Sequence, residues 1–222
     1  MKEVRPVRSS MRLSDLKNLI KTGEGLFLEF KRTIPSPEKI ARELCAFANT
    51  KGGTLLIGID DDGSIVGMES FYEEQFLLND AVYYLCKPEL DLTVEIVEYK
   101  QREIAIVLVN EAKEKPILVD LGNEWAGFVR VNDKSIRASK EMLKVLKNQT
   151  SDEGVSFVFG PNEQKLFRYL NQYERITVNE FSNLVNISTR RASRILVNLV
   201  SAGVLHLFTH EKAEFFTLAR AF

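Results

Sequence analysis

Apolar residues in the first part of the chain recur at helical spacing in several separate segments. Leucine and isoleucine follow this spacing over 13–20, which predicts a short amphipathic helix. A second helix is predicted to begin at Ser36, with Pro37 in its first turn. Helical spacing returns in the region before Pro88 and again over 139–149. These segments predict helices at both ends and in the middle of one folded region.

Other segments alternate strictly between apolar and polar residues, as half-buried strands do. Strands are predicted at 26–31, in a hairpin over 53–68 around "DDDG", in a hairpin over 91–111 around "KQRE", and at 115–120 and 127–133. Because these strands and the helices follow one another without a regular βαβ repeat, we predict an α+β domain with a mixed sheet.

The pattern changes after residue 150. A polar segment with two glycines and a proline over 148–164 separates it from a region of purely helical spacing. Three short helices are predicted there, the third capped by Ser188, followed by a hairpin over 204–219. Three helices followed by a two-stranded wing are the order of a winged helix-turn-helix. We therefore predict two domains, 1–150 and 151–222.

Composition excludes several classes of protein. The chain has 222 residues, and no apolar run approaches the roughly 20 residues that a helix needs to span a bilayer, so we expect a cytoplasmic protein. Cys45 and Cys86 lie far apart within apolar helical patterns and are predicted to be buried free thiols. With His206 and His210 as the only histidines, a zinc site is not predicted.

The charge balance is even in total and uneven along the chain, with 30 Lys and Arg against 31 Asp and Glu. Eleven acids and a single lysine lie between Asp60 and Glu98, so this zone should repel phosphate. Basic residues dominate 125–150, and the segment 181–210 contains three arginines and no acid. The two basic zones are candidate nucleic-acid surfaces, although a basic zone can also be only a solvated face.

The third C-terminal helix is the main candidate, because a winged helix-turn-helix places the start of this helix in the major groove of DNA. Arginine suits both phosphate oxygens and the guanine edge. The predicted DNA contacts in this helix are Thr189, Arg190, Arg191 and Arg194, and those in the other basic zone are Arg130, Lys134 and Arg137. A winged helix that serves protein contacts is the alternative.

Three segments together resemble a known family. "EGLFLEFKR" at 24–32, "AFANTKGGTLLIGIDDDGSIVG" at 46–67 and "GFVRVNDKSIRAS" at 127–139 are similar to the Schlafen AlbA-type DNA-binding domain family, also described as divergent AAA ATPases. The resemblance covers about residues 10–148. It implies an α+β fold and, as in bacterial members that are transcriptional regulators, a C-terminal winged helix.

The resemblance also implies an alternative function. Ribonuclease members of this family use two glutamates and an aspartate as an acidic, metal-dependent site, and Glu24, Glu29 and Asp61 match these positions. Carboxylate oxygens of this kind bind Mg²⁺ or Mn²⁺, which can activate water. The other interpretation pairs Glu29 with Lys31 on an exposed strand face and leaves the aspartates to the turn.

We interpret the chain as a DNA-binding transcriptional regulator that binds double-stranded DNA as a homodimer and is not an enzyme, with no cofactor. The alternatives are a metal-dependent nuclease using Mg²⁺ or Mn²⁺, and a non-hydrolysing ATP-binding module. ATP enters only through the family description, because the sequence lacks the G-x-x-x-x-G-K-[ST] pattern of a P-loop.

Overall fold

The structure is a computed structural model that describes residues 3–151, 159–210 and 213–219. Its contacts divide the chain into two compact units, Met1–Arg137 and Ala138–Phe222. The helix predicted over 139–149 therefore groups with the C-terminal unit. That residues 1–150 and 151–222 are separate domains stays a prediction.

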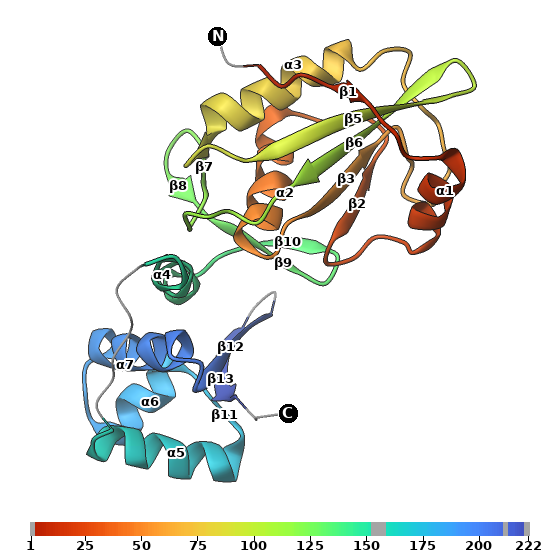
Figure 1. The fold of residues 1–222 in the computed structure, drawn as a ribbon. Coiled ribbons are helices and arrows are strands. Elements are labelled where there is room, and N and C mark those ends of the chain that lie inside the picture. Colours follow the sequence, from red (N-terminus) through yellow and green to blue (C-terminus); the bar gives the residue numbers. More distant parts are fainter. Residues whose placement is uncertain (1–2, 152–158, 211–212, 220–222) are drawn as a thin grey trace. The chain divides into compact units, whose positions relative to one another are not determined.

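The N-terminal unit is built on a five-stranded sheet with the order β1-β5-β6-β3-β2 (Figure 1). The strands are β1 (Val7–Arg8), β2 (Leu28–Lys31), β3 (Gly53–Ile57), β5 (Leu92–Tyr99) and β6 (Arg102–Val109). The β1–β5 and β2–β3 pairs are parallel, whereas β6 is antiparallel to both of its neighbours. Lys100 and Gln101 both have positive φ in the two-residue turn of the β5–β6 hairpin. The predicted hairpin, mixed sheet and α+β class are confirmed.

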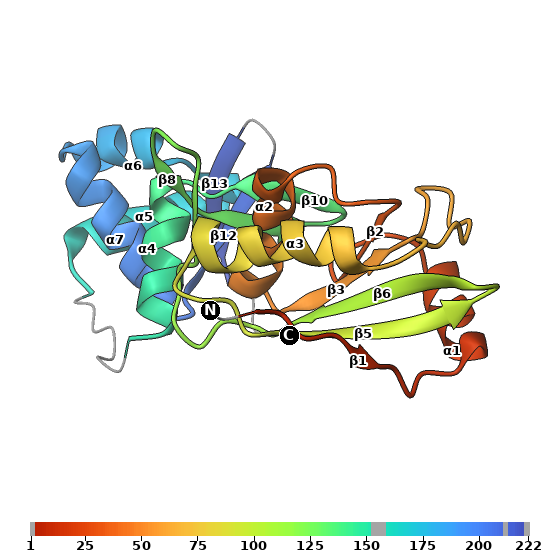
Figure 2. The same cartoon turned by 90° about the horizontal axis from the view of Figure 1, so that it is seen from above.

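Alternate residues of strand β3 serve two cores. Leu55 and Ile57 of β3 pack in the cluster that contains helix α2 (Pro37–Asn49), while Leu56 packs in the cluster of helix α1 (Leu13–Lys21). Figures 1 and 2 show these two helices on opposite faces of the sheet. The remaining elements of this unit are α3 (Tyr72–Asp80), the π-helical turn η1 (Ala81–Leu85), β4 (Cys86–Lys87), β7 (Leu118–Asp120), β8 (Trp125–Ala126), β9 (Phe128–Val131) and β10 (Lys134–Arg137).

The hairpin predicted around "DDDG" forms only in part. After β3 the chain makes a single antiparallel bridge between Ile59 and Ile65 instead of a second ladder. Gly58 has φ +97° and the amides of both Gly58 and Ile59 donate to the carbonyl of Lys31, so the chain leaves the sheet there. A Cβ at Gly58 would lie 3.1 Å from the Cα of Gly67, which confirms the predicted close packing of these two glycines.

In its described residues, the C-terminal unit contains four helices and one small sheet. Its elements are α4 (Lys140–Gln149), α5 (Pro161–Tyr173), β11 (Arg175–Ile176), α6 (Val178–Val185), α7 (Thr189–Ser201), β12 (Leu205–His210) and β13 (Ala213–Leu218). The three strands are antiparallel in the order β11-β13-β12, and part of the predicted "THEK" turn lies outside the described residues. Leu170, Phe181, Leu196 and Phe216 meet in its core. The three predicted helices and the hairpin after them are confirmed.

Both cysteines are buried free thiols, as predicted. Burial raises the pKa of Cys45 to about 12 and that of Cys86 higher still, so both thiols stay protonated at neutral pH. In the ranges that the structure describes, no helix is long and apolar enough to cross a membrane.

Candidate nucleic-acid interface

Helix α7 begins where local sequence rules place its start. Asn186 has a left-handed backbone conformation and ends α6, and Ser188 then caps α7 in an extended conformation. The Ser188 hydroxyl accepts a hydrogen bond from the amide of Arg191 at 3.3 Å. This cap fixes Thr189, Arg190 and Arg191 as the first turn of the helix.

The core side of α7 orients its basic side. Ala192, Leu196 and Leu199 are fully buried at helical spacing in the core of the C-terminal unit. Arg190 and Arg194 therefore lie on the solvent side with Arg191 and Thr189, and all four are exposed. Among the described residues, none of these arginines forms an ion pair.

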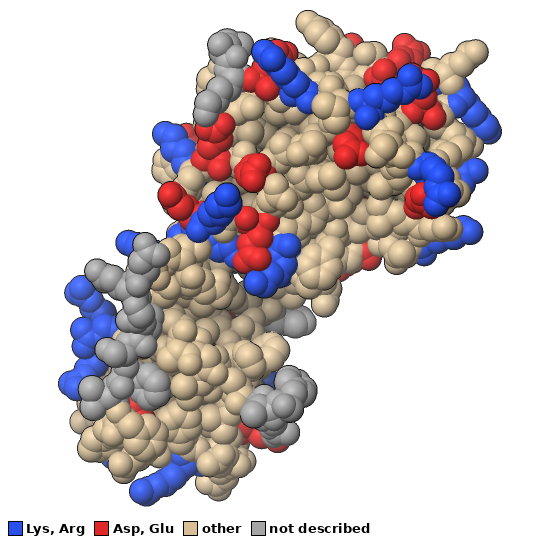
Figure 3. Space-filling view, in the orientation of Figure 1, with Lys and Arg blue, Asp and Glu red and all other residues tan. Residues whose placement is uncertain are grey.

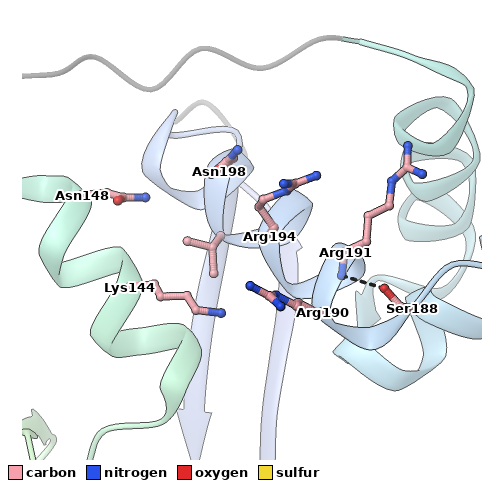
Figure 4. Close-up of a pocket in the computed structure, with 8 residues that line it drawn as sticks. Lys144, Asn148, Ser188, Arg190, Arg191, Arg194 and Asn198 are labelled. Atoms are coloured by element: carbon pink, nitrogen blue, oxygen red, sulfur yellow. Dashed lines mark hydrogen bonds between the residues drawn. The ribbon is translucent and has the colours of Figure 1, made fainter.

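The three arginines border a groove of about 470 Å³ between α4 and α7. Lys144 and Asn148 of α4 line one wall, and residues of α7 line the other wall (Figure 4). Arg190, Arg194 and Asn198 line the groove from the α7 side, and Figure 4 shows the Arg190 side chain pointing toward Lys144. Positive and amide side chains from both helices thus share one open space.

Hydrogen bonds hold α4 alongside α7. The ammonium group of Lys144 donates to the Ser193 hydroxyl at 3.1 Å, and that hydroxyl donates to the Glu141 carboxylate at 2.7 Å. Asn148 donates to the hydroxyl of Ser201 at 3.0 Å. The packing of α4 against α7 was not predicted from the sequence. Its signal is the pair Ser193 and Ser201, which lie about two helical turns apart on one side of α7.

Arg130, predicted as a DNA contact, lies elsewhere and is buried. Its guanidinium group donates to Glu29 at 3.0 Å and to Glu43 at 2.9 Å, and it lies over the ring of Phe47, 4.7 Å from the centroid. The side chain has no exposed surface. The prediction assumed an exposed arginine and is corrected: Arg130 completes the interior of the N-terminal unit and cannot reach a DNA backbone.

The rest of this second basic zone is exposed and partly neutralised. Arg137 makes two parallel hydrogen bonds to the Glu124 carboxylate, at 2.9 and 2.5 Å. The hydrogen bond from Arg137 lowers the pKa of Glu124. Lys134 is exposed at the start of β10. On the face that Figure 3 displays, acidic and basic side chains are interspersed over this unit.

Of the three predicted acidic residues, Glu24 is affected by the charges of the other two. Burial raises the pKa of Glu24, and the charges of Glu29 and Asp61 raise it further, against the opposing effects of the Phe30 amide and Lys31. Glu24 accepts a hydrogen bond from that amide at 2.8 Å. Glu29 is buried, not exposed as one interpretation assumed, although its predicted pairing with Lys31 is present.

The surroundings of Glu29 do not fit a divalent metal. One carboxylate oxygen of Glu29 accepts from Lys31 and the other accepts from Arg130, so two positive charges already lie against it. A divalent cation there would be repelled by both groups. Among the described residues, no group of three or more His, Cys, Asp or Glu side chains is arranged to hold a metal ion.

The family model for the Schlafen AlbA_2 domain matches residues 24–139, just over half of the chain. The chain belongs to the Schlafen AlbA_2 family. The AlbA_2 match includes Glu24, Glu29, Asp61 and Arg130, whereas helices α4 and α7 lie outside it. The groove between these helices is therefore a feature of the sequence beyond the AlbA_2 domain.

Two solved structures are similar to part of the AlbA_2 chain. One is the N-terminal domain of a protein from Nitrosomonas europaea that is related to the ATP-dependent DNA helicase RecG, with 25% identity and a TM-score of 0.43 over 54% of this chain and 88% of that one. The other is the DIP2311 protein from Corynebacterium diphtheriae, with 20% identity and a TM-score of 0.43 over 59% of this chain. That match spans only 28% of the Corynebacterium protein.

Proposed function

We propose that the C-terminal unit is a winged helix-turn-helix that binds duplex DNA, with α7 as the recognition helix, and that the protein is a transcriptional regulator. The order α5, β11, α6, α7, β12, β13 supports this assignment, because three helices with a strand pair after the third are the elements of that fold. Membership of the AlbA_2 family supports association with nucleic acid.

One observation carries the proposal: the first turns of α7 bear three exposed arginines and no acid. The N-terminus of a helix carries partial positive charge, so a cation there is unfavourable by about 0.3–1 kcal/mol. Arg190 and Arg191 in the first turn therefore weaken the folded state slightly and make no compensating ion pair with a described residue. A phosphate backbone or a guanine edge would reverse this electrostatic penalty.

The larger unit then has a separate role in the proposed regulator. We assign it effector binding or oligomerisation, and we expect a symmetric dimer, since paired half-sites multiply the affinity of helix-turn-helix proteins. Lys134 and Arg137 are the remaining candidates there for secondary backbone contacts. Light scattering of the full chain, alone and with duplex DNA, measures the oligomeric state.

The main experiment is a binding titration of the full chain with fluorescent duplex DNA at several salt concentrations. The double variant Arg190→Ala/Arg191→Ala should bind more weakly, and its slope of log K against log salt should be shallower by about 0.9 for each phosphate that the variant no longer neutralises. Loss of a base contact would instead weaken the binding free energy by about 1–3 kcal/mol and relax the sequence preference at one base pair.

The matched control is Arg168→Ala, which removes an exposed arginine from α5 in the same unit. It should keep the wild-type slope. If the double variant and the control bind duplex DNA equally well, α7 is not the recognition helix, and the C-terminal unit binds another partner.

A further inference from the structure

The groove between α4 and α7 collects positive charge from two helices. Lys144 lines it from α4, and Arg190 and Arg194 line it from α7 (Figure 4). Among the described residues that line the groove, none is acidic. Like charges that share one space repel each other, and an anion between them would replace the repulsion with attraction.

Lys144 is held in place for such a role. Its ammonium group has three N–H donors, and the hydrogen bond to Ser193 occupies one of them. Ser193 is itself buried and donates its own proton to Glu141, which leaves the hydroxyl oxygen to accept from Lys144. This chain of bonds orients the ammonium group at the rim of the groove, where further donors are available to a ligand.

Two amides add neutral donors to the same space. Asn148 is fixed by its bond to Ser201, and Asn198 reaches the groove from α7. With a volume of about 470 Å³, the groove has room for a phosphate group together with an attached sugar.

We propose that this groove is a phosphate-binding site in which Lys144 of α4 acts together with Arg190 and Arg194 of α7. The proposal rests on the function assigned to α7 and extends it: the phosphate belongs to the backbone of the bound duplex, and α4 is part of the DNA interface. A free phosphorylated ligand would offer the same chemistry, so the test separates the two sources.

The first arm measures duplex binding by Lys144→Ala against a matched control, Lys147→Ala. Lys147 is an exposed lysine of the same helix that does not line the groove. Removal of one phosphate contact should make the salt slope of Lys144→Ala shallower by about 0.9 and weaken binding roughly 5- to 10-fold near 0.1 M salt. Lys147→Ala should keep the wild-type slope.

The second arm uses inorganic phosphate at constant ionic strength and follows the side-chain amide signals of Asn148 and Asn198 by NMR. Both signals should shift in a saturable way in the wild type and in Lys147→Ala. The shifts should be absent in Lys144→Ala, whose melting temperature reports whether the fold is intact. Sodium chloride should not reproduce them.

The outcomes separate this proposal from the proposed function. If the salt slope of duplex binding becomes shallower in Lys144→Ala and stays at the wild-type value in Lys147→Ala, a backbone phosphate lies in the groove. Duplex binding that depends on Arg190 and Arg191, with identical slopes for both lysine variants and no phosphate shifts, overturns the groove and leaves the recognition helix. Saturable phosphate shifts without duplex binding support the phosphate site, with a free ligand as its source, and overturn the DNA function. If neither duplex binding nor saturable phosphate shifts are observed, both the DNA function and the phosphate site are overturned.

Discussion

Arg130 in β9 and Arg190 in α7 both belong to segments that a charge count marks as basic, yet their guanidinium groups have opposite surroundings. Arg130 has no exposed surface and lies between the carboxylates of Glu29 and Glu43. Arg190 is exposed and forms no ion pair with the described residues. A positive residue contributes to a binding surface only where the fold leaves its charge both exposed and uncompensated.

The same comparison separates an arginine that stabilises the fold from one that is available to a ligand. A buried ion pair is expensive to break, because the remaining charge stays in a medium of low dielectric. An exposed cation at the start of a helix lowers the free energy of unfolding slightly, because the helix N-terminus also carries positive charge. Removing each kind of arginine should therefore change the free energy of unfolding in opposite directions.

The largest effect is expected for Arg130→Ala. The substitution leaves Glu29 and Glu43 without their shared partner and removes the packing on Phe47. The free energy of unfolding of the N-terminal unit should fall by about 3–5 kcal/mol. Urea denaturation followed by circular dichroism measures this decrease. A decrease below about 1 kcal/mol would mean that Arg130 is not the partner that these carboxylates need.

A small effect of opposite sign is expected for Arg190→Ala/Arg191→Ala. Removing two cations from the first turn of α7 should leave the free energy of unfolding unchanged or raise it by up to about 1 kcal/mol in total. The same denaturation experiment measures it, so the variant that impairs DNA binding should not be less stable. Destabilisation by more than about 1 kcal/mol would show that these arginines make structural contacts.

The smallest effect concerns Glu24. Its pKa is raised in the folded state, mainly by burial, so the native protein binds more protons than the unfolded chain above pH 4.5. Stability should therefore fall as the pH rises through that pKa. Glu24→Gln can still accept the Phe30 amide and should remove this fall. The stability of the variant relative to the wild type should therefore increase as the pH rises above 4.5, as measured by thermal unfolding.

Glu38→Gln is the matched control, and the change in stability that it causes should have the opposite sign. A hydrogen bond with Ser36 lowers the pKa of Glu38 in the folded state, so its contribution to stability is present above pH 4.5 and is lost as the pH falls through the lowered pKa. This variant should therefore be less stable than the wild type at neutral pH. If both variants show the same pH dependence, the pKa of Glu24 is not raised in the folded state.

Sequence patterns alone located most helices and strands, because the signals are local. Caps such as Ser36, Ser139 and Ser188 act within three residues, and the alternation in β5 and β6 extends across a turn of two residues. The "DDDG" segment was predicted as a full hairpin because its local signals are those of a turn. The contacts of Gly58 and Ile59 with Lys31 of a neighbouring strand decided otherwise.

The site was predictable only as far as it is local. The order of residues from Ser188 to Arg194 and the apolar spacing of α7 are sufficient to place the arginines on the exposed side of a helix. The fate of Arg130 depends on Glu29 and Glu43, which lie 101 and 87 positions away, and Lys144 meets Ser193 across 49 positions. Burial and charge compensation arise from such distant partners, so only the tertiary structure decided which basic residues are available to a ligand.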